Sequence, residues 1–167
     1  MKKLTLVLSI AALIVLSGLG LAFQRPSFAG DWTMDRARSF GLPATMNQAM
    51  KVAQNGEQID LETRIINPDG ENTIKDSYTI DGKQHDFTPQ GAKGPIPNSK
   101  GKRTANWLPN GKGIMVEEET VTDTPKGAVT NKVVRKWTMS ADGELTIDMY
   151  FDGPNGSYEN KRIFKKS

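Results

Sequence analysis

From Gly30 onward, apolar and polar residues alternate along most of the chain, and turn-forming residues interrupt this alternation repeatedly. Asn55-Gly56 is the clearest turn, and Asp81-Gly82, Pro125-Lys126 and Gly153–Gly156 mark further reversals. Alternation with a period of two residues is typical of strands that bury one face. The pattern therefore predicts an all-β chain built from consecutive hairpins.

The segments between turns predict about ten strands. Their approximate ranges are 30–35, 46–54, 57–66, 72–80, 83–88, 102–108, 113–123, 128–139, 144–152 and 156–165. An open sheet of this size would expose a long edge, which closure into a barrel removes. We expect one domain, residues 30–166, in which an antiparallel up-and-down meander closes into a barrel of about 8–10 strands. A two-sheet sandwich is the alternative.

The first predicted strand carries a short motif. Gly30-Asp31-Trp32 resembles the G-x-W signature of the lipocalin-like (calycin) barrels, and residues 30–166 also resemble small secreted bacterial proteins with a Trp-Thr-x-Ser-x-Asp-Gly hairpin, here Trp137 to Gly143. The resemblance implies a lipocalin-like barrel. It further implies that Trp32 closes one barrel end and packs against an arginine near the end of the barrel, for which Arg162 is the matching residue.

The N-terminal segment has the features of an export signal. Two lysines precede an apolar run at residues 4–16, and Gly20 and Ala22 supply the small residues of a cleavage site. We expect residues 1–22 to be a signal peptide, with Ser27-Phe28-Ala29 as a later cleavage point. The mature protein would then be periplasmic or extracellular, with no membrane span. An uncleaved anchor is the alternative, although the run is shorter than the roughly 20 residues that cross a bilayer.

Composition excludes several classes of function. The chain has no Cys, which rules out disulfides, thiolate zinc sites and a cysteine nucleophile. Without the first two lysines, 20 of the 22 basic residues remain against 19 acidic ones, so charge gives no support for nucleic-acid binding. No phosphate loop or nucleophile elbow is present, and His85 is the one histidine. We expect no metal and no cofactor.

Strand parity predicts which side chains face the barrel interior. The apolar inward set is Met46, Met50, Val52, Ile59, Leu61, Ile65, Ile74, Tyr78, Ile80, Phe87, Val133, Trp137, Met139, Leu145, Ile147, Met149, Phe151, Tyr158 and Phe164. The polar inward set is Asp76, His85, Glu118, Arg135, Asn160 and Arg162. Because a buried charge without a partner costs several kcal/mol, these groups are expected to pair with each other, with water or with a ligand.

Hairpin registers refine the interior. The Pro125-Lys126 turn places Arg135 beside Val116 and diagonal to Glu118, and the Gly153–Gly156 turn places Arg162 beside Ile147. The same turn places Asn160 beside Met149.

Two interpretations of this interior remain open. In the first, Arg135, Asn160 and Tyr158 donate to one ligand carboxylate. This arrangement resembles that of fatty-acid-binding barrels. Further candidates for ligand contacts in the interior are Tyr78, His85 and Trp137. In the second, the groups are structural: Arg135 pairs with Glu118, Arg162 stacks on Trp32, and two guanidiniums balance two carboxylates without any ligand.

Three functional hypotheses follow. The leading one is an exported barrel, not an enzyme, that binds a small apolar or amphipathic ligand. The second is a solid-cored structural or interaction module whose partner contacts the Pro- and Gly-rich loop at residues 89–101. The third is an enzyme using His85, which parity sets opposite Tyr78 and diagonal to Asp76. The oligomeric state and the ligand's identity are not predicted.

Overall fold

The computed structural model describes residues 25–91 and 93–167, and ten strands form one antiparallel sheet. The strands are β1 (Gly30–Met34), β2 (Asn47–Asn55), β3 (Gln58–Asn67), β4 (Gly70–Thr79), β5 (Gln84–Phe87), β8 (Ser99–Trp107), β9 (Gly113–Thr124), β10 (Gly127–Met139), β11 (Leu145–Gly153) and β12 (Gly156–Lys166). Two short strands, β6 (Gln90–Gly91) and β7 (Gly94–Pro95), form a separate small hairpin within the 89–101 loop. The prediction of an all-β antiparallel meander is confirmed.

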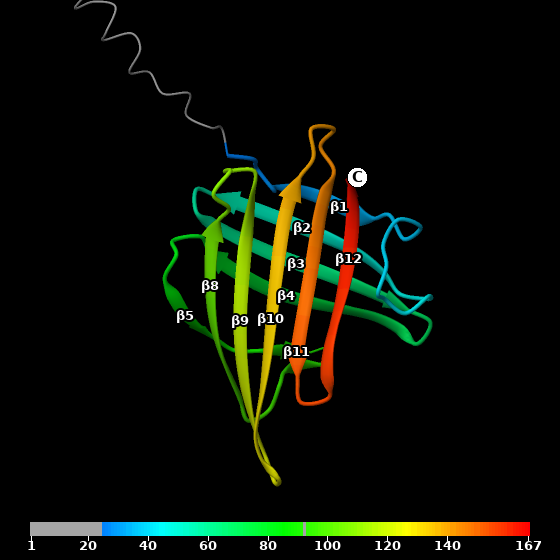
Figure 1. Ribbon diagram of the computed structural model, residues 1–167. Coiled ribbons are helices and arrows are strands. Elements are labelled where there is room, and N and C mark those ends of the chain that lie inside the picture. The colour runs from blue at the N-terminus through cyan, green and yellow to red at the C-terminus, as the bar shows by residue number, and fades with distance from the viewer. Residues whose placement is uncertain (1–24, 92) are drawn as a thin grey trace, which may run out of the picture.

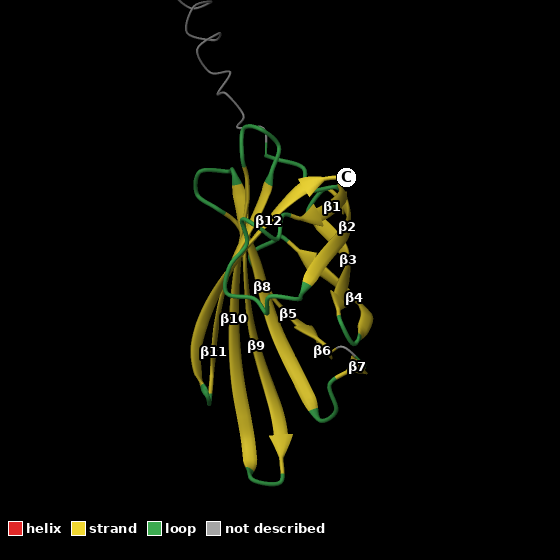
Figure 2. Cartoon of the chain, turned by 90° about the vertical axis from the view of Figure 1, so that its right-hand side faces the viewer, coloured by secondary structure: helices red, strands yellow, loops and turns green. Residues whose placement is uncertain are grey.

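The sheet is curled, and the first and last strands of the chain, β1 and β12, pair with each other in the middle of it. Its order is β4-β3-β2-β1-β12-β11-β10-β9-β8-β5, so β1 pairs with both β2 and β12. Figure 1 shows β1–β4 crossing behind β8–β12, and Figure 2 shows the two halves drawing together at one end and spreading at the other. One curled sheet, rather than a two-sheet sandwich, encloses the interior.

The predicted signal peptide, residues 1–22, lies outside the described residues. Among the residues that the structure describes, no helix is both long enough and apolar enough to cross a membrane.

The wall of the barrel is interrupted between β4 and β5, the two ends of the sheet. After β4, the Ile80 amide donates to the Glu57 carbonyl at 2.8 Å, whereas the Gly82 amide donates to the Ala105 carbonyl at 3.0 Å. The turn therefore leaves β4 and carries β5 to β8, the one strand of the described sheet with which β5 pairs.

This interruption corrects one predicted register. The Asp81-Gly82 turn was expected to set His85 opposite Tyr78, but His85 pairs with Arg103 on β8. The His85 ring lies 3.0 Å from the Asp81 carboxylate, and its side chain is 45% exposed. The predicted His85–Asp76 pairing is wrong, and with it the geometry that the enzyme hypothesis required.

Aromatic side chains fill one end of the barrel. The aromatic residues that are fully or almost fully buried there are Phe28, Trp32, Trp137 and Phe164, and the aliphatic Ile59 is buried with them. The Trp32 indole donates to the Phe28 carbonyl at 2.9 Å, and the Phe28 and Trp137 rings meet edge to face at 5.7 Å. Burying side chains of this size contributes roughly 1.5–3 kcal/mol each, so this packed end anchors the fold.

Trp32 lies in this packed end, where the G-x-W resemblance places it, but its cationic neighbour is a different residue. The Lys166 ammonium lies 5.5 Å from the centre of the Trp32 ring, because Lys166 is the cross-strand partner of Trp32. Arg162 is four residues earlier on β12, and its Nε and Nη1 donate to other side chains. The prediction that Arg162 stacks on Trp32 is therefore wrong.

Candidate functional site

The inner face of β9–β12 carries the predicted polar residues in the predicted registers. Arg135 on β10 lies opposite Val116 and Met149, and Arg162 on β12 lies opposite Ile147. The long hairpins fix these pairs, because the three turns between the four strands set their registers. The two guanidiniums consequently approach one region of the interior.

An arginine from β8 organises the polar network. Arg103 is 6% exposed, and its guanidinium donates to the Glu118 carboxylate at 2.6 Å and to both Asp76 oxygens at 2.7 and 2.8 Å. It also donates to the Ser77 carbonyl at 2.6 Å. Since Asp76 and Ser77 belong to β4, this one side chain ties β8, the neighbour of the end strand β5, to β4 at the other end of the sheet.

Aromatic rings hold the Arg103 guanidinium in place. It lies 4.7 Å from the centre of the Tyr78 ring and 4.0 Å from that of Phe87. Phe87 reaches this position because its cross-strand partner is Gly101, where a Cβ would lie 2.3 Å from the Phe87 ring. Cation–π contacts of this kind contribute about 0.5–2 kcal/mol each when desolvated.

Glu118 joins Arg103 to Arg135. Burial disfavours the charged Glu118 carboxylate, but attraction to Arg135 and Arg103 outweighs burial and lowers its pKa below the ordinary value of 4.5. Burial opposes the charge of Arg135 as well, and Glu118 nevertheless raises the pKa of Arg135. The Arg135–Glu118 ion pair of the structural interpretation is present.

Arg162 has a different environment. Its Nε donates to the Asn160 side-chain oxygen at 3.1 Å, and its Nη1 donates to the Gln48 side-chain oxygen at 3.1 Å. Both partners are neutral and buried. Burial, and then repulsion from Arg135, lower the pKa of Arg162 from 12.5 to about 10. Within residues 25–91 and 93–167, Arg162 therefore has no carboxylate partner for its charge.

Arg103 also changes the charge balance expected from sequence. The predicted inward groups comprised two guanidiniums and two carboxylates. With Arg103, the described part of the barrel directs three guanidiniums inward, at positions 103, 135 and 162, against the carboxylates of Asp76 and Glu118. These inward groups, which are buried or half-buried, therefore carry one positive charge in excess.

An interior cavity of about 120 Å³ lies beside this excess charge. Its polar wall includes Arg162, Arg135, Gln48 and Asp76, and Tyr78 and Trp137 contribute rings. Its apolar wall is formed by Met50, Leu61, Ile65, Ile74, Ile147 and Met149. The described residues offer no hydrogen-bond acceptor to the buried Nε1 of Trp137.

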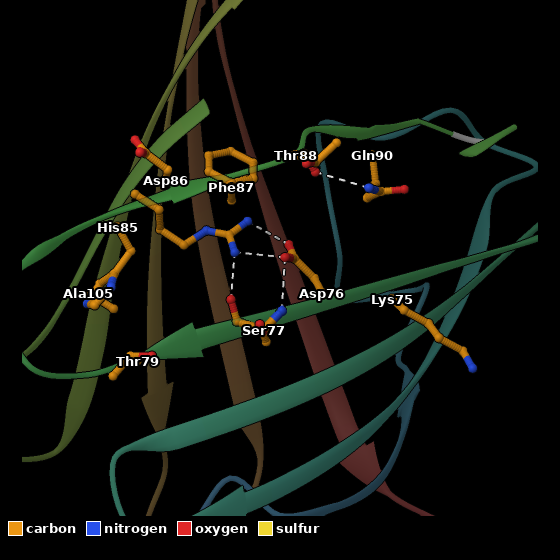
Figure 3. A pocket seen from close by; sticks show the side chains of 11 residues that line it. Lys75, Asp76, Ser77, Thr79, His85, Asp86, Phe87, Thr88, Gln90 and Ala105 are labelled. Atoms are coloured by element: carbon orange, nitrogen blue, oxygen red, sulfur yellow. Dashed lines mark hydrogen bonds and ion pairs between the residues drawn. The ribbon is translucent and has the colours of Figure 1, made fainter. Parts of the chain in front are cut away.

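A larger pocket of about 570 Å³, which we call the window pocket, opens at the interruption between β4 and β5. Asp76, Ser77 and Thr79 line it from β4, and Phe87, Thr88 and Gln90 line it from β5 and the following residues. Figure 3 shows the β4 and β5 side chains facing each other across the pocket, with dashed lines at Asp76 and Ser77.

The predicted site residues fall into two groups. Arg135, Tyr78 and Trp137 line the interior cavity together with Arg162, and Asn160 is buried as a hydrogen-bond acceptor of Arg162. Burial raises the pKa of Tyr78.

Two predicted candidates lie apart from that cavity. Tyr158 is 51% exposed and stacks on Phe151 at 4.8 Å, and His85 lines the window pocket beside Asp81. The structure therefore does not bring Tyr158 together with Arg135 and Asn160 as donors to one carboxylate. The described residues also contain no group of three side chains suited to holding a metal ion.

Arg103 is the functional residue that sequence reasoning missed. Its parity matches that of Ala105 and Trp107 on the same strand, so alternation alone would have placed it inward. The residues before Arg103, which include Lys100 and Lys102, contain no large apolar side chain. This part of the strand therefore shows no alternation that would indicate which side chains face inward.

Comparisons with known proteins agree with the calycin-like fold. No protein-family model matches the sequence, and no curated protein matches it significantly. The structure of zebrafish ileal bile acid-binding protein, in complex with cholic acid, is similar at a TM-score of 0.53 and 17% identity, over 84% of this chain and 98% of that one. Secretory abundant heat soluble protein 4 from Ramazzottius varieornatus matches at a TM-score of 0.46 and 13% identity, over 83% and 94% of the two chains. The similarity to the bile acid-binding protein shows that this chain shares its curled antiparallel β-barrel fold.

Proposed function

We propose that this protein binds a small amphipathic carboxylate inside its barrel and that Arg162 holds the carboxylate group. The observation that carries the proposal is the half-buried Arg162 guanidinium, whose hydrogen-bond acceptors are the neutral side chains of Gln48 and Asn160. A buried charge is normally paired, and an anionic ligand would supply the missing partner. Charge-assisted hydrogen bonds of this kind contribute about 1.5–3 kcal/mol each.

The remainder of the cavity wall suits the other parts of such a ligand. The Trp137 Nε1–H is a buried donor without an acceptor among the described residues, and a carboxylate oxygen is an acceptor. Methionine and branched aliphatic side chains cover the rest of the wall. A cavity of about 150 Å³ accommodates benzene, so a cavity of about 120 Å³ holds a carboxylate with its first methylenes, and the rest of a longer acid extends through the open side of the cavity. The fold neighbour solved with cholic acid supports an acid ligand as a class.

Export belongs to the same proposal. The sequence favours a signal peptide, and of its two cleavage points the earlier one suits the fold. Phe28 is fully buried, and its ring packs against Trp137 and Trp107. Cleavage after Ala29 would remove that ring from the core, at a cost of about 3–5 kcal/mol for a residue of this size.

Isothermal titration with hexanoate tests the binding proposal. We expect saturable binding to the unmodified chain and at least tenfold weaker binding to Arg162→Met, whereas Arg64→Met should bind like the unmodified chain. Arg64 is a suitable control because it pairs with Glu71 at the surface. Hexanol, which lacks the charge, should bind at least tenfold more weakly than hexanoate. Equal affinities for the Arg162→Met and unmodified chains would refute the proposal.

The second candidate is a structural or interaction module without a small ligand. One observation favours it: charge-assisted hydrogen bonds join Arg135, Glu118, Arg103 and Asp76, whose two guanidiniums balance two carboxylates, as in a purely structural network. Arg162 separates the two candidates, because a structural network leaves its charge unbalanced. Absence of hexanoate binding, and of binding by other short carboxylates, would favour the structural module.

A further inference from the structure

The interior cavity and the window pocket share one residue of their walls. Asp76 lines both, and no other residue is common to the two linings. Its carboxylate accepts two hydrogen bonds from Arg103, which lines the window pocket. The Asp76–Arg103 ion pair therefore stands between a cavity of about 120 Å³ and a pocket of about 570 Å³.

Asp76 is the half of this pair that can move. The Arg103 side chain is 6% exposed, and Glu118, the Ser77 carbonyl and two aromatic rings fix it in position. The Asp76 side chain is 25% exposed and belongs to β4, which has no partner strand on its outer side. If Asp76 rotates toward solvent, Arg103 keeps the acceptors of Glu118 and Ser77, whereas Asp76 gains water.

We infer that the window pocket is the outer compartment of the ligand site, an inference that rests on the proposed function. With the carboxylate at Arg162, the body of a ligand longer than the interior cavity passes Asp76 and lies in the window pocket. Phe87 offers this body an apolar surface, and Thr79, Thr88 and Gln90 offer hydroxyl and amide groups. The ligand class is a carboxylate with an aliphatic body and a polar far end.

The inference gives Asp76 a role beyond pairing with Arg103. Hexanoate fills the interior cavity and extends only as far as Asp76, whereas 10-hydroxydecanoate continues past Asp76 into the window pocket. Because each additional buried methylene strengthens binding several-fold, the longer acid should bind the unmodified chain at least tenfold more tightly than hexanoate.

Filling the window pocket tests the inference. Ser77 is exposed and lines the pocket, so Ser77→Trp places an indole there without disturbing the core. Thr73→Trp is the matched control, since Thr73 is exposed on the same strand with the same parity and lies outside the pocket lining. We expect Ser77→Trp to weaken 10-hydroxydecanoate binding at least tenfold and to change hexanoate affinity less than threefold, and Thr73→Trp to change neither.

The outcomes separate the two proposals. If hexanoate fails to bind the unmodified chain, the proposed function and this inference fall together. If hexanoate binds but Ser77→Trp leaves 10-hydroxydecanoate affinity unchanged, the window inference alone is overturned, because the ligand body then follows another path. Asp76→Asn provides a second measurement: it weakens the ion pair at nearly constant size and should accelerate association of 10-hydroxydecanoate in stopped-flow fluorescence. An unchanged association rate would contradict the inference.

Discussion

Supplying Arg162 with a carboxylate partner should stabilise the protein. Gln48 is 4% exposed, and its side-chain oxygen already accepts a hydrogen bond from Arg162 at 3.1 Å, so Gln48→Glu adds a negative charge at nearly constant volume. A pKa lowered from 12.5 to about 10 means that the fold disfavours the charge of Arg162 by roughly 3 kcal/mol. Pairing recovers this cost, and desolvation of the new carboxylate offsets part of the gain. We expect a net increase of about 1–2 kcal/mol in the free energy of unfolding at pH 7.

Urea denaturation at several pH values measures this effect. Arg162 lowers the pKa of the new carboxylate, so the added stability is present above the ordinary glutamate value near 4.5 and disappears as pH falls below it. Gln84→Glu, at an exposed position of β5, is the control and should change stability by less than about 0.5 kcal/mol. Gln48→Glu should also abolish hexanoate binding, because the new carboxylate occupies Arg162. Destabilisation at pH 7 that is relieved at pH 3 would refute the idea of an unbalanced positive charge.

Further predictions concern the network and the packed end. Arg103→Met leaves Asp76 and Glu118 with fewer hydrogen-bond partners. Urea denaturation should therefore show a free energy of unfolding lower by about 3–5 kcal/mol. A loss below about 1 kcal/mol would contradict the role of Arg103 across the sheet interruption. Because the pKa of Glu118 is lowered in the fold, its contribution to stability is present above pH 4.5 and is lost as pH falls below that value. Glu118→Gln should therefore show a shallower fall in stability between pH 5 and pH 3 than the unmodified chain, and equal slopes would contradict this assignment. Gly113→Ala should cost about 1–3 kcal/mol, since its Cβ would lie 2.1 Å from the Trp137 carbonyl; an unchanged melting temperature would contradict it.

Local hairpins explain which parts of the fold were predictable. The β9–β10 and β11–β12 turns fix the registers of Arg135 and Arg162, and both were predicted correctly. A type I′ turn with Asn55-Gly56 as its central residues would pair Val52 with Ile59, but Val52 pairs with Leu61. Gly56 has a φ of +60° and is the first central residue of the turn, which is the position that a type II′ turn reserves for glycine. Because this shift is two residues, every inward side chain stays inward.

Contacts between distant segments explain what was missed. His85 was placed opposite Tyr78 on the assumption that neighbouring strands pair, yet β5 pairs with β8 and leaves β4 free. The hydrogen bond from the Gly82 amide to the Ala105 carbonyl, which draws β5 away, has no signature in the local sequence. The role of Arg103 depends on the same interruption. Strand parity could have placed Arg103 inward, but its ion pair with Asp76 could be recognised only once the sheet ends had been located.

The indole resonance of Trp137 offers the most direct measurement of ligand binding in the interior. Trp137 lines the cavity, and its Nε1–H has no acceptor among the described residues, whereas the Nε1–H of Trp32 donates to the Phe28 carbonyl within the packed end. Both indole groups give signals in a ¹⁵N–¹H correlation spectrum. Titration with hexanoate should shift the Trp137 signal saturably, leave the Trp32 signal in place, and have no effect on Trp137 in the Arg162→Met variant. A Trp137 signal that does not respond to hexanoate or to any other short carboxylate would contradict the proposal that the barrel binds an anion.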